Sequence, residues 1–279
     1  MPTATARTLE INGLRLGYGE TVIIPDLSLA VPTGKVTALI GPNGCGKSTL
    51  LRGIARLLKP ANGTISVDGR PVSSYGGKEF ARMVGLLPQI PVTPEGITVA
   101  DLVARGRYPY QGLFRGANRD DDAAVARALE ATNTLELADR QVTELSGGQR
   151  QRVWIALALA QETDVLLLDE PTTYLDLAHQ VELLDLLATI NEERGTTMVM
   201  VLHELNLAAR IAHHLVAMKD GRIAASGSAE QVLTSAHLEE IFGLQAEVAD
   251  PLADGSIVVV PRARATARAM SELATDAGV

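Results

Sequence analysis

The chain has 279 residues, of which 46% are apolar and 21% charged, and this composition excludes disorder along its whole length. Its formal net charge of −8 disfavours a polyanion, so we do not expect nucleic acid as a partner. The single cysteine permits no intrachain disulfide and leaves a thiolate zinc site short of ligands, which suits a reducing compartment.

The predicted elements begin with two strands, at 9–16 and 22–31, whose alternating apolar and polar residues favour an antiparallel start. Four short runs follow that are apolar on both faces, as is typical of buried parallel strands. They occupy residues 36–40, 84–87, 165–168 and 198–202. Helical patterns at 47–58 and 180–193 lie between these strands. The alternation predicts a three-layer α/β sheet.

The alternation of strands and helices stops after residue 87. Residues 97–161 carry only helical patterns, at 100–105, 120–131 and 149–161, which indicates an inserted helical lobe. A hairpin signal at Asp220-Gly221 precedes short strands and a small helix. We therefore predict one domain over residues 1–262 and a disordered tail at 263–279. The parts of the domain are a core with a β subdomain (1–90 and 162–230), a helical subdomain (91–161) and C-terminal strands and helix (231–262).

Residues 41–49 fit the phosphate-binding pattern G-x-x-x-x-G-K-S/T, directly between a buried strand and a helix. The glycines let backbone N–H groups surround a phosphate, and the positive end of the helix points to the same place. We expect Lys47 to reach the β- and γ-phosphates and the Ser48 hydroxyl to bind Mg²⁺. Cys45 is interpreted as a small loop filler rather than a redox group. The predicted nucleotide-binding residues of this loop are Gly41, Pro42, Asn43, Gly44, Cys45, Gly46, Lys47, Ser48 and Thr49.

Polar side chains at the ends of three other buried strands are expected to complete this site. Asp169 is placed to hold Mg²⁺, and Glu170 to orient or deprotonate the attacking water. Gln89 offers an amide to Mg²⁺ or to the water, and His203 offers a hydrogen bond to the γ-phosphate. The sequence therefore predicts Ser48, Gln89 and Asp169 as metal ligands, and Lys47, Gln89, Glu170 and His203 as catalytic residues.

Residues 145–149, Leu-Ser-Gly-Gly-Gln, form a second anion site inside the helical lobe. A hydroxyl and two glycines precede a helix there, and the N-terminus of a helix suits an anion. The chain therefore holds two anion sites but only one complete Mg²⁺ site.

This five-residue signature, with its flanking loops, resembles the ATPase subunit of an ABC transporter, and the similarity extends over residues 9–260. The resemblance implies a P-loop NTPase (RecA-like) core that hydrolyses ATP with Mg²⁺. It also implies a head-to-tail homodimer in which the signature of one chain closes on the γ-phosphate held by Lys47 of the other. Tyr18 would stack on adenine; the alternative is that Tyr18 is a turn aromatic packed on the first sheet. Asp176 would belong to the loop that communicates between the two nucleotide sites. The implied contacts of the signature come from Ser146, Gly147, Gly148 and Gln149.

Segments 103–111, 170–180 and 199–210 are similar to the ATPases of ferric-siderophore importers. The similarity implies iron-chelate uptake with a membrane permease and, indirectly, a substrate-binding protein, at the cytoplasmic face of the membrane. The chain departs from the pattern of this family at two places: Glu204 stands where Asp is common, and Ile-Ala-His-His occupies 211–214. The sequence therefore does not identify the transported chelate. We interpret His213 and His214 as helix-end residues. Cobalamin or haem import is the near alternative, and a soluble ABC ATPase acting on ribosomes or DNA is the alternative from another class.

A membrane role is expected to depend on docking, because the sequence has no secretory signal and no apolar run near the roughly 18 residues of a membrane span. Tyr108, Tyr110 and Phe114 stand close together in a chain with only 3% aromatic residues. Three arginines accompany them, and both residue types are enriched at interfaces. These residues, with Arg105, Arg107 and Arg115, predict the permease contact, unless they form part of the core of the lobe.

Overall fold

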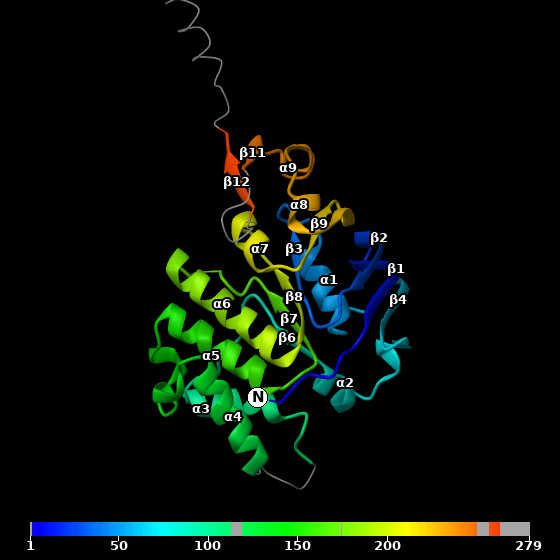
Figure 1. The fold of residues 1–279 in the computed structure, drawn as a ribbon. Coiled ribbons are helices and arrows are strands. Elements are labelled where there is room, and N and C mark those ends of the chain that lie inside the picture. The colour runs from blue at the N-terminus through cyan, green and yellow to red at the C-terminus, as the bar shows by residue number, and fades with distance from the viewer. Residues whose placement is uncertain (1, 113–118, 174, 250–256, 263–279) are drawn as a thin grey trace, which may run out of the picture.

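The computed structural model describes residues 2–112, 119–173, 175–249 and 257–262. A six-stranded, mostly parallel sheet lies at its centre (Figure 1). In spatial order its strands are β10 (Arg222–Gly227), β9 (His214–Lys219), β3 (Val36–Ile40), β8 (Thr197–Val201), β7 (Val165–Asp169) and β6 (Val84–Leu87). The four predicted parallel strands are confirmed within one residue at each end, and every residue of β3, β7 and β8 is buried. Successive residues of β3 face two different cores, which explains why the run is apolar on both faces.

A second, antiparallel sheet covers one face of the central sheet, with helix α1 (Lys47–Ile54) packed between them. Its strands, in spatial order, are β2 (Thr21–Val31), β1 (Leu9–Tyr18), β4 (Asn62–Val67) and β5 (Arg70–Pro71). The antiparallel pairing of β1 with β2 confirms the predicted start of the chain. The sequence pattern did not predict β4, whose first half is exposed. The predicted helix 47–58 is shorter than expected, because α1 ends at Ile54.

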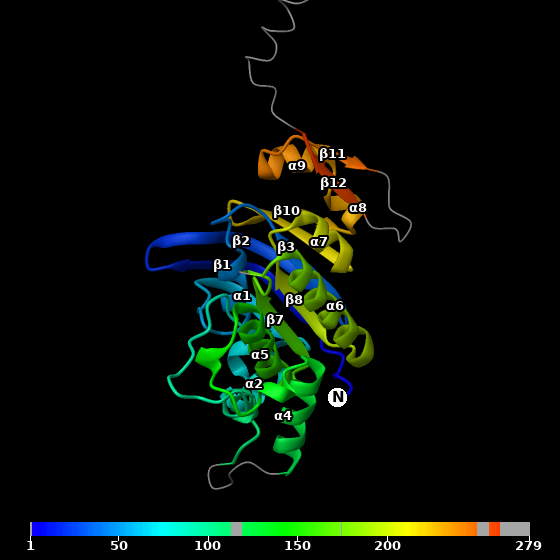
Figure 2. The ribbon, with the colours of Figure 1, turned by 90° about the vertical axis from the view of Figure 1, so that its left-hand side faces the viewer.

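Helices cover the other face of the central sheet, and Figure 2 shows α6 on the side opposite the antiparallel sheet. The inserted lobe consists of helices, as predicted. The lobe elements are α3 (Val99–Ala104), η2 (Arg105–Arg107), α4 (Arg119–Ala131), η3 (Leu135–Leu137), η4 (Val142–Glu144) and α5 (Gly147–Ala160). The other two helices on this face are α6 (Leu177–Arg194) and α7 (Leu205–Ile211). None of the helices in the described ranges is long and apolar enough to cross a membrane.

Two short elements flank the sheets, and the sequence pattern did not predict them: η1 (Val72–Ser74) lies against β4, and α2 (Gly77–Met83) lies against β6. The last elements of the described residues lie together at one end of the molecule (Figure 1). After the β9–β10 hairpin come α8 (Ala229–Val232), α9 (Ser235–Phe242), β11 (Ala246–Ala249) and β12 (Val258–Pro261). This region has two short helices where one was expected. The predicted tail at 263–279 lies outside the described residues.

Candidate active site

The phosphate loop joins β3 to α1 and requires its first glycine. Gly41 has φ of 147°, and a Cβ atom there would lie 2.2 Å from the carbonyl oxygen of Met218 on β9. Lys47, at the start of α1, is only 5% exposed, and its ammonium donates to the carbonyl oxygens of Gly41 (2.7 Å) and Pro42 (2.9 Å). The Lys47 side chain therefore folds back over the loop, where its charge is available to a phosphate.

Cys45, in the middle of this loop, is buried. Burial raises the pKa of its thiol, and this effect outweighs the nearby Lys47 ammonium. A thiol that resists deprotonation is a poor nucleophile, so the geometry agrees with the interpretation of Cys45 as a loop filler.

Ser48 and Asp169 connect α1 to the carboxyl end of β7. The Ser48 hydroxyl donates to Oδ1 of Asp169 at 2.8 Å, although the two residues are 121 positions apart. Asp169 is 4% exposed, and burial raises the pKa of its carboxyl group. Two of the three predicted metal ligands therefore lie together, with the third, Gln89, next to Glu170.

Glu170 is the meeting point of the predicted catalytic side chains. Its Oε1 lies 2.7 Å from Nε2 of His203, and its Oε2 accepts from Nε2 of Gln89 at 2.6 Å and from Oγ1 of Thr173 at 3.1 Å. Its backbone has φ of 53°, in the left-handed region that a non-glycine residue rarely adopts. The structure thus brings Gln89, Glu170 and His203 to one rim of the sheet. The sequence analysis missed Thr173, whose only signal was a hydroxyl three residues after Glu170.

The signature residues form a separate site at the start of α5. Ser146 accepts from the amide of Gln149 at 3.2 Å, and the Gln149 side chain accepts from the amide of Ser146 at 3.1 Å, which makes a capping box. These residues line a cavity of about 500 Å³ together with Gly147, Gly148 and Asp176. The cavity is lined further by Asn133, Thr134, Glu136, Leu137, Arg152, Leu175 and His179. Sequence reasoning named none of these seven residues.

Asp176 caps the N-terminus of α6 on the far side of the same cavity. Its Oδ1 accepts from the amide of His179 at 2.9 Å and lies 2.7 Å from Nδ1 of that ring. These hydrogen bonds lower the pKa of the Asp176 carboxyl group. The structure therefore places Asp176 and the signature residues around one shared cavity, and a role for Asp176 between the two nucleotide sites stays a prediction.

Tyr18 ends β1 and is 45% exposed. Its hydroxyl accepts from Nη1 of Arg52 on α1 at 3.1 Å, which places the ring near the helix that follows the phosphate loop. Stacking of adenine on this exposed ring stays a prediction.

The predicted docking segment divides between surface and core. Tyr108 is 68% exposed, whereas Tyr110 is half-buried and donates its hydroxyl to the carbonyl of Gln161 at 2.9 Å. The prediction that Arg107 lies at an interface is wrong, because this residue is 5% exposed and paired with acidic side chains of the lobe. Phe114 and Arg115 lie outside the described residues.

His213 and His214 lie where the chain passes from α7 into β9. His213 follows α7, and its Nδ1 accepts from the amide of Val36 at 3.2 Å. His214 is the first residue of β9, so its interpretation as a helix-end residue is wrong. Within the described ranges, no group of three or more His, Cys, Asp and Glu residues is arranged to hold a metal ion.

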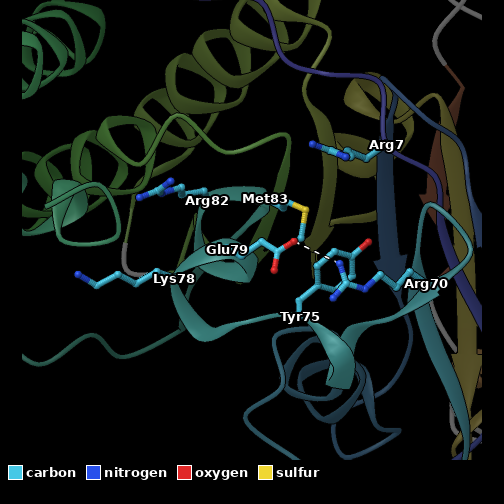
Figure 3. Close-up of a pocket in the computed structure, with 7 residues that line it drawn as sticks. All are labelled: Arg7, Arg70, Tyr75, Lys78, Glu79, Arg82 and Met83. Atoms are coloured by element: carbon cyan, nitrogen blue, oxygen red, sulfur yellow. Dashed lines mark hydrogen bonds and ion pairs between the residues drawn. The ribbon is translucent and has the colours of Figure 1, made fainter. Parts of the chain in front are cut away.

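A further cavity, of about 530 Å³, lies beside α2 (Figure 3). Arg70 pairs with Glu79 at 3.3 Å and stacks 4.1 Å from the ring centroid of Tyr75. Lys78 and Arg82 point away from Tyr75 (Figure 3), toward the segment that follows η2. The cations around this cavity already have partners, and we assign it no ligand.

Comparison with known proteins agrees with this geometry. A family model described as ABC transporter matches residues 24–173. The chain is 53% identical to a probable siderophore transport system ATP-binding protein of Bacillus subtilis, over 90% of this chain and 91% of that one. It is 49% identical to the ferric enterobactin transport ATP-binding protein of Escherichia coli, over 94% and 97%. A solved structure of a putative metal-chelate type ABC transporter in an inward-facing conformation is 31% identical, with a TM-score of 0.80 over 93% of this chain and 98% of that one.

Proposed function

This chain belongs to the ABC transporter family, and we propose that it is the ATP-hydrolysing subunit of an importer for ferric siderophores or related iron chelates. The observation that carries the proposal is the gathering of Lys47, the Ser48–Asp169 pair and Glu170 with its partners along one edge of the sheet. The cargo is supported by the two relatives named for siderophore and ferric enterobactin transport. These names give no support to cobalamin or haem import.

We propose that the phosphate loop binds the β- and γ-phosphates of ATP. The Lys47 ammonium has only uncharged partners among the described residues, two carbonyl oxygens and the Cys45 sulfur, and a phosphate oxygen is a stronger partner because it carries charge. The loop amides and the positive end of α1 add neutral donors at the same place. Tyr18 would stack on the adenine ring.

The residues present fit a magnesium ion. Mg²⁺ prefers hard oxygen ligands, and Ser48 and Asp169 bring a hydroxyl and a carboxylate oxygen within 2.8 Å of each other. Gln89 would supply an amide oxygen. When bound, Mg²⁺ neutralises charge that develops on the phosphate oxygens during transfer.

Hydrolysis requires a group that orients water in line with the γ-phosphate, and we assign this role to Glu170. Gln89 and Thr173 fix one carboxylate oxygen of Glu170, and His203 holds the other. A water that reaches Glu170 takes the place of one of these donors, so nucleotide binding and the positions of Gln89 and His203 are linked. His203 is then free to donate to the γ-phosphate.

Two half-sites in one chain favour a head-to-tail homodimer. The signature cavity holds Ser146, Gly147, Gly148 and Gln149 but lacks the Lys47 and Asp169 that a complete site needs. In the proposed dimer it closes on the ATP bound to the phosphate loop of the partner chain. Asp176, in the same cavity, would connect the two sites.

We propose that the dimer docks on a membrane permease at the cytoplasmic face, with the exposed Tyr108 in the contact, and that a substrate-binding protein delivers the chelate. We also propose a division of the domain into three parts. They are a core with a β subdomain (1–90 and 162–230), a helical subdomain (91–161) and C-terminal strands and helix (231–262).

Two measurements test the proposed function. With Glu170→Gln and saturating ATP, light scattering should show a dimer, because binding persists while hydrolysis stops; persistent monomers would refute the split site. In a strain that lacks the chain, radioactive iron supplied as a siderophore should enter only after wild-type complementation. Restored uptake of cobalamin or haem instead would assign another cargo, and tight binding to ribosomes or DNA would favour the soluble alternative.

A further inference from the structure

Arg107 is a buried cation that joins three parts of the lobe. Its Nε donates to Oδ1 of Asp121 on α4 at 3.0 Å, and its Nη1 donates to the carbonyl of Ala160 at 2.7 Å and to Oε2 of Glu162 at 2.9 Å. The side chain of Arg107 is 6% exposed and that of Glu162 is 12% exposed. An arginine in this setting needs its acidic partners, because an unpaired buried charge is costly.

Glu162 occupies the junction between α5 of the lobe and β7 of the sheet. Its φ of 49° is in the left-handed region, so the chain turns sharply at this residue. Arg107 and Arg127 bind its two carboxylate oxygens, each at 2.9 Å. The hydroxyl of Tyr110 donates to the carbonyl of the preceding residue, Gln161. The segment 105–110 is therefore fastened to the turn that leads into β7.

The far end of β7 carries the proposed catalytic groups. Asp164, directly before β7, accepts from the amide of Thr5 at 2.7 Å and from Nε of Arg7 at 3.0 Å, so the start of the strand is also connected to the N-terminal segment. Four residue steps then span about 13 Å to Asp169, which Glu170 follows. We expect a displacement of the Glu162 turn to reach Glu170 along this buried strand, because packed interiors have low compressibility and transmit strain.

A second connection runs from the same segment to the same carboxylate. Arg82, on α2, donates to the carbonyl of Pro109 at 3.0 Å, and its side chain points away from Tyr75 in Figure 3. Helix α2 continues directly into β6, and Gln89 after β6 donates to Glu170. The segment 105–111 is thus linked to Glu170 through two neighbouring strands.

We propose that Arg107 and Glu162 are a positioning pair that couples the segment carrying Tyr108 to the hydrolytic site at Glu170. The inference rests on the proposed function, namely that ATP binds at the phosphate loop, that Glu170 supports its hydrolysis and that Tyr108 contacts the permease. Coupling between two sites is reciprocal, so we expect nucleotide bound at the phosphate loop to change the stability of the segment 105–111 in the purified chain.

Hydrogen exchange of the purified chain, with and without Mg²⁺ and the non-hydrolysable analogue AMP-PNP, tests the pair. In the wild type we expect the analogue to slow amide exchange at 105–111 by about fivefold, the lower end of usual site-to-site coupling. Arg107→Lys and Glu162→Gln should reduce this effect to less than about twofold, while protection of the phosphate loop stays unchanged. Thermal unfolding on the same samples shows whether each variant is folded.

Arg127→Gln is the matched control, because Arg127 binds the same carboxylate from α4, outside the segment 105–111. This control should keep the wild-type response to the analogue. Equal slowing in the wild type, Arg107→Lys and Glu162→Gln would overturn the proposal, as would loss of the response in Arg127→Gln or its absence in the wild type. ATP hydrolysis by the wild-type chain tests the proposed function separately: an active chain without the exchange response refutes only the positioning pair.

Discussion

Replacing Gly41 by alanine should destabilise the nucleotide-free protein by about 2–6 kcal/mol. Two effects contribute. A non-glycine residue at φ of 147° costs about 1–3 kcal/mol in backbone strain. The new methyl group would also lie 2.2 Å from the carbonyl oxygen of Met218 and 2.9 Å from the sulfur of Cys45, and relieving such overlap in a packed core costs about 1–3 kcal/mol. The sum is a large share of a typical stability of about 5–15 kcal/mol.

Gly44→Ala separates the two effects in the same loop. Gly44 has φ of 78°, but a Cβ there would have no heavy atom within 4 Å outside its chain neighbours, so only the strain of about 1–2 kcal/mol applies. Urea unfolding without nucleotide, followed by the fluorescence of Trp154, the single tryptophan, gives both values. Equal losses of stability in the two variants would refute the argument that contact with β9, rather than backbone strain alone, requires Gly41.

Three further predictions concern ionisable groups. Glu170→Gln should lower kcat by about 10²–10⁴-fold, with little change in ATP affinity because the phosphate loop is untouched. Phosphate release measures kcat, and nucleotide titration measures the affinity. A kcat near that of the wild type would remove Glu170 from the mechanism. Burial raises the pKa of the Asp169 carboxyl above its usual 3.8, so the charged carboxylate destabilises the folded state as pH rises. Asp169→Asn should therefore unfold at a higher temperature than the wild type at pH 7, and at the same temperature near pH 3. The ATPase activity of this variant should fall. Burial and the nearby Lys35 lower the pKa of His213 below 6.5, so the stability that depends on its neutral ring is lost as pH falls below that value. In urea unfolding, His213→Asn should therefore show a smaller loss of unfolding free energy at low pH than the wild type. Identical pH profiles would contradict a role of the neutral His213 ring in stability.

The elements that carry the phosphate site were predictable because their signals are local. Strand β3 is short and apolar on both faces, the loop 41–49 has its glycines at fixed spacing, and α1 follows at once. Each property depends on a few adjacent residues. For the same reason the strand ends that supply Asp169 and Glu170 could be located, and the topology of a parallel sheet brought them to one edge.

The missed elements have weak or long-range signals. Strand β4 is half exposed and joins its sheet by pairing with β1, about fifty residues earlier in the chain, so its short sequence shows little periodicity. Thr173 donates to Glu170 across a turn that begins at the left-handed backbone of Glu170, and such a turn leaves little signal in the sequence.

Arg107 shows most clearly what only the tertiary structure decided. In the sequence it stands among aromatic residues and arginines, a composition typical of an interface. The fold buries it and pairs it with Asp121 and Glu162, which are 14 and 55 positions away. The local pattern determined where phosphate can bind, because that site is built from adjacent backbone groups. The structure decided which charges face water, because burying a charge depends on partners that folding brings from distant parts of the chain.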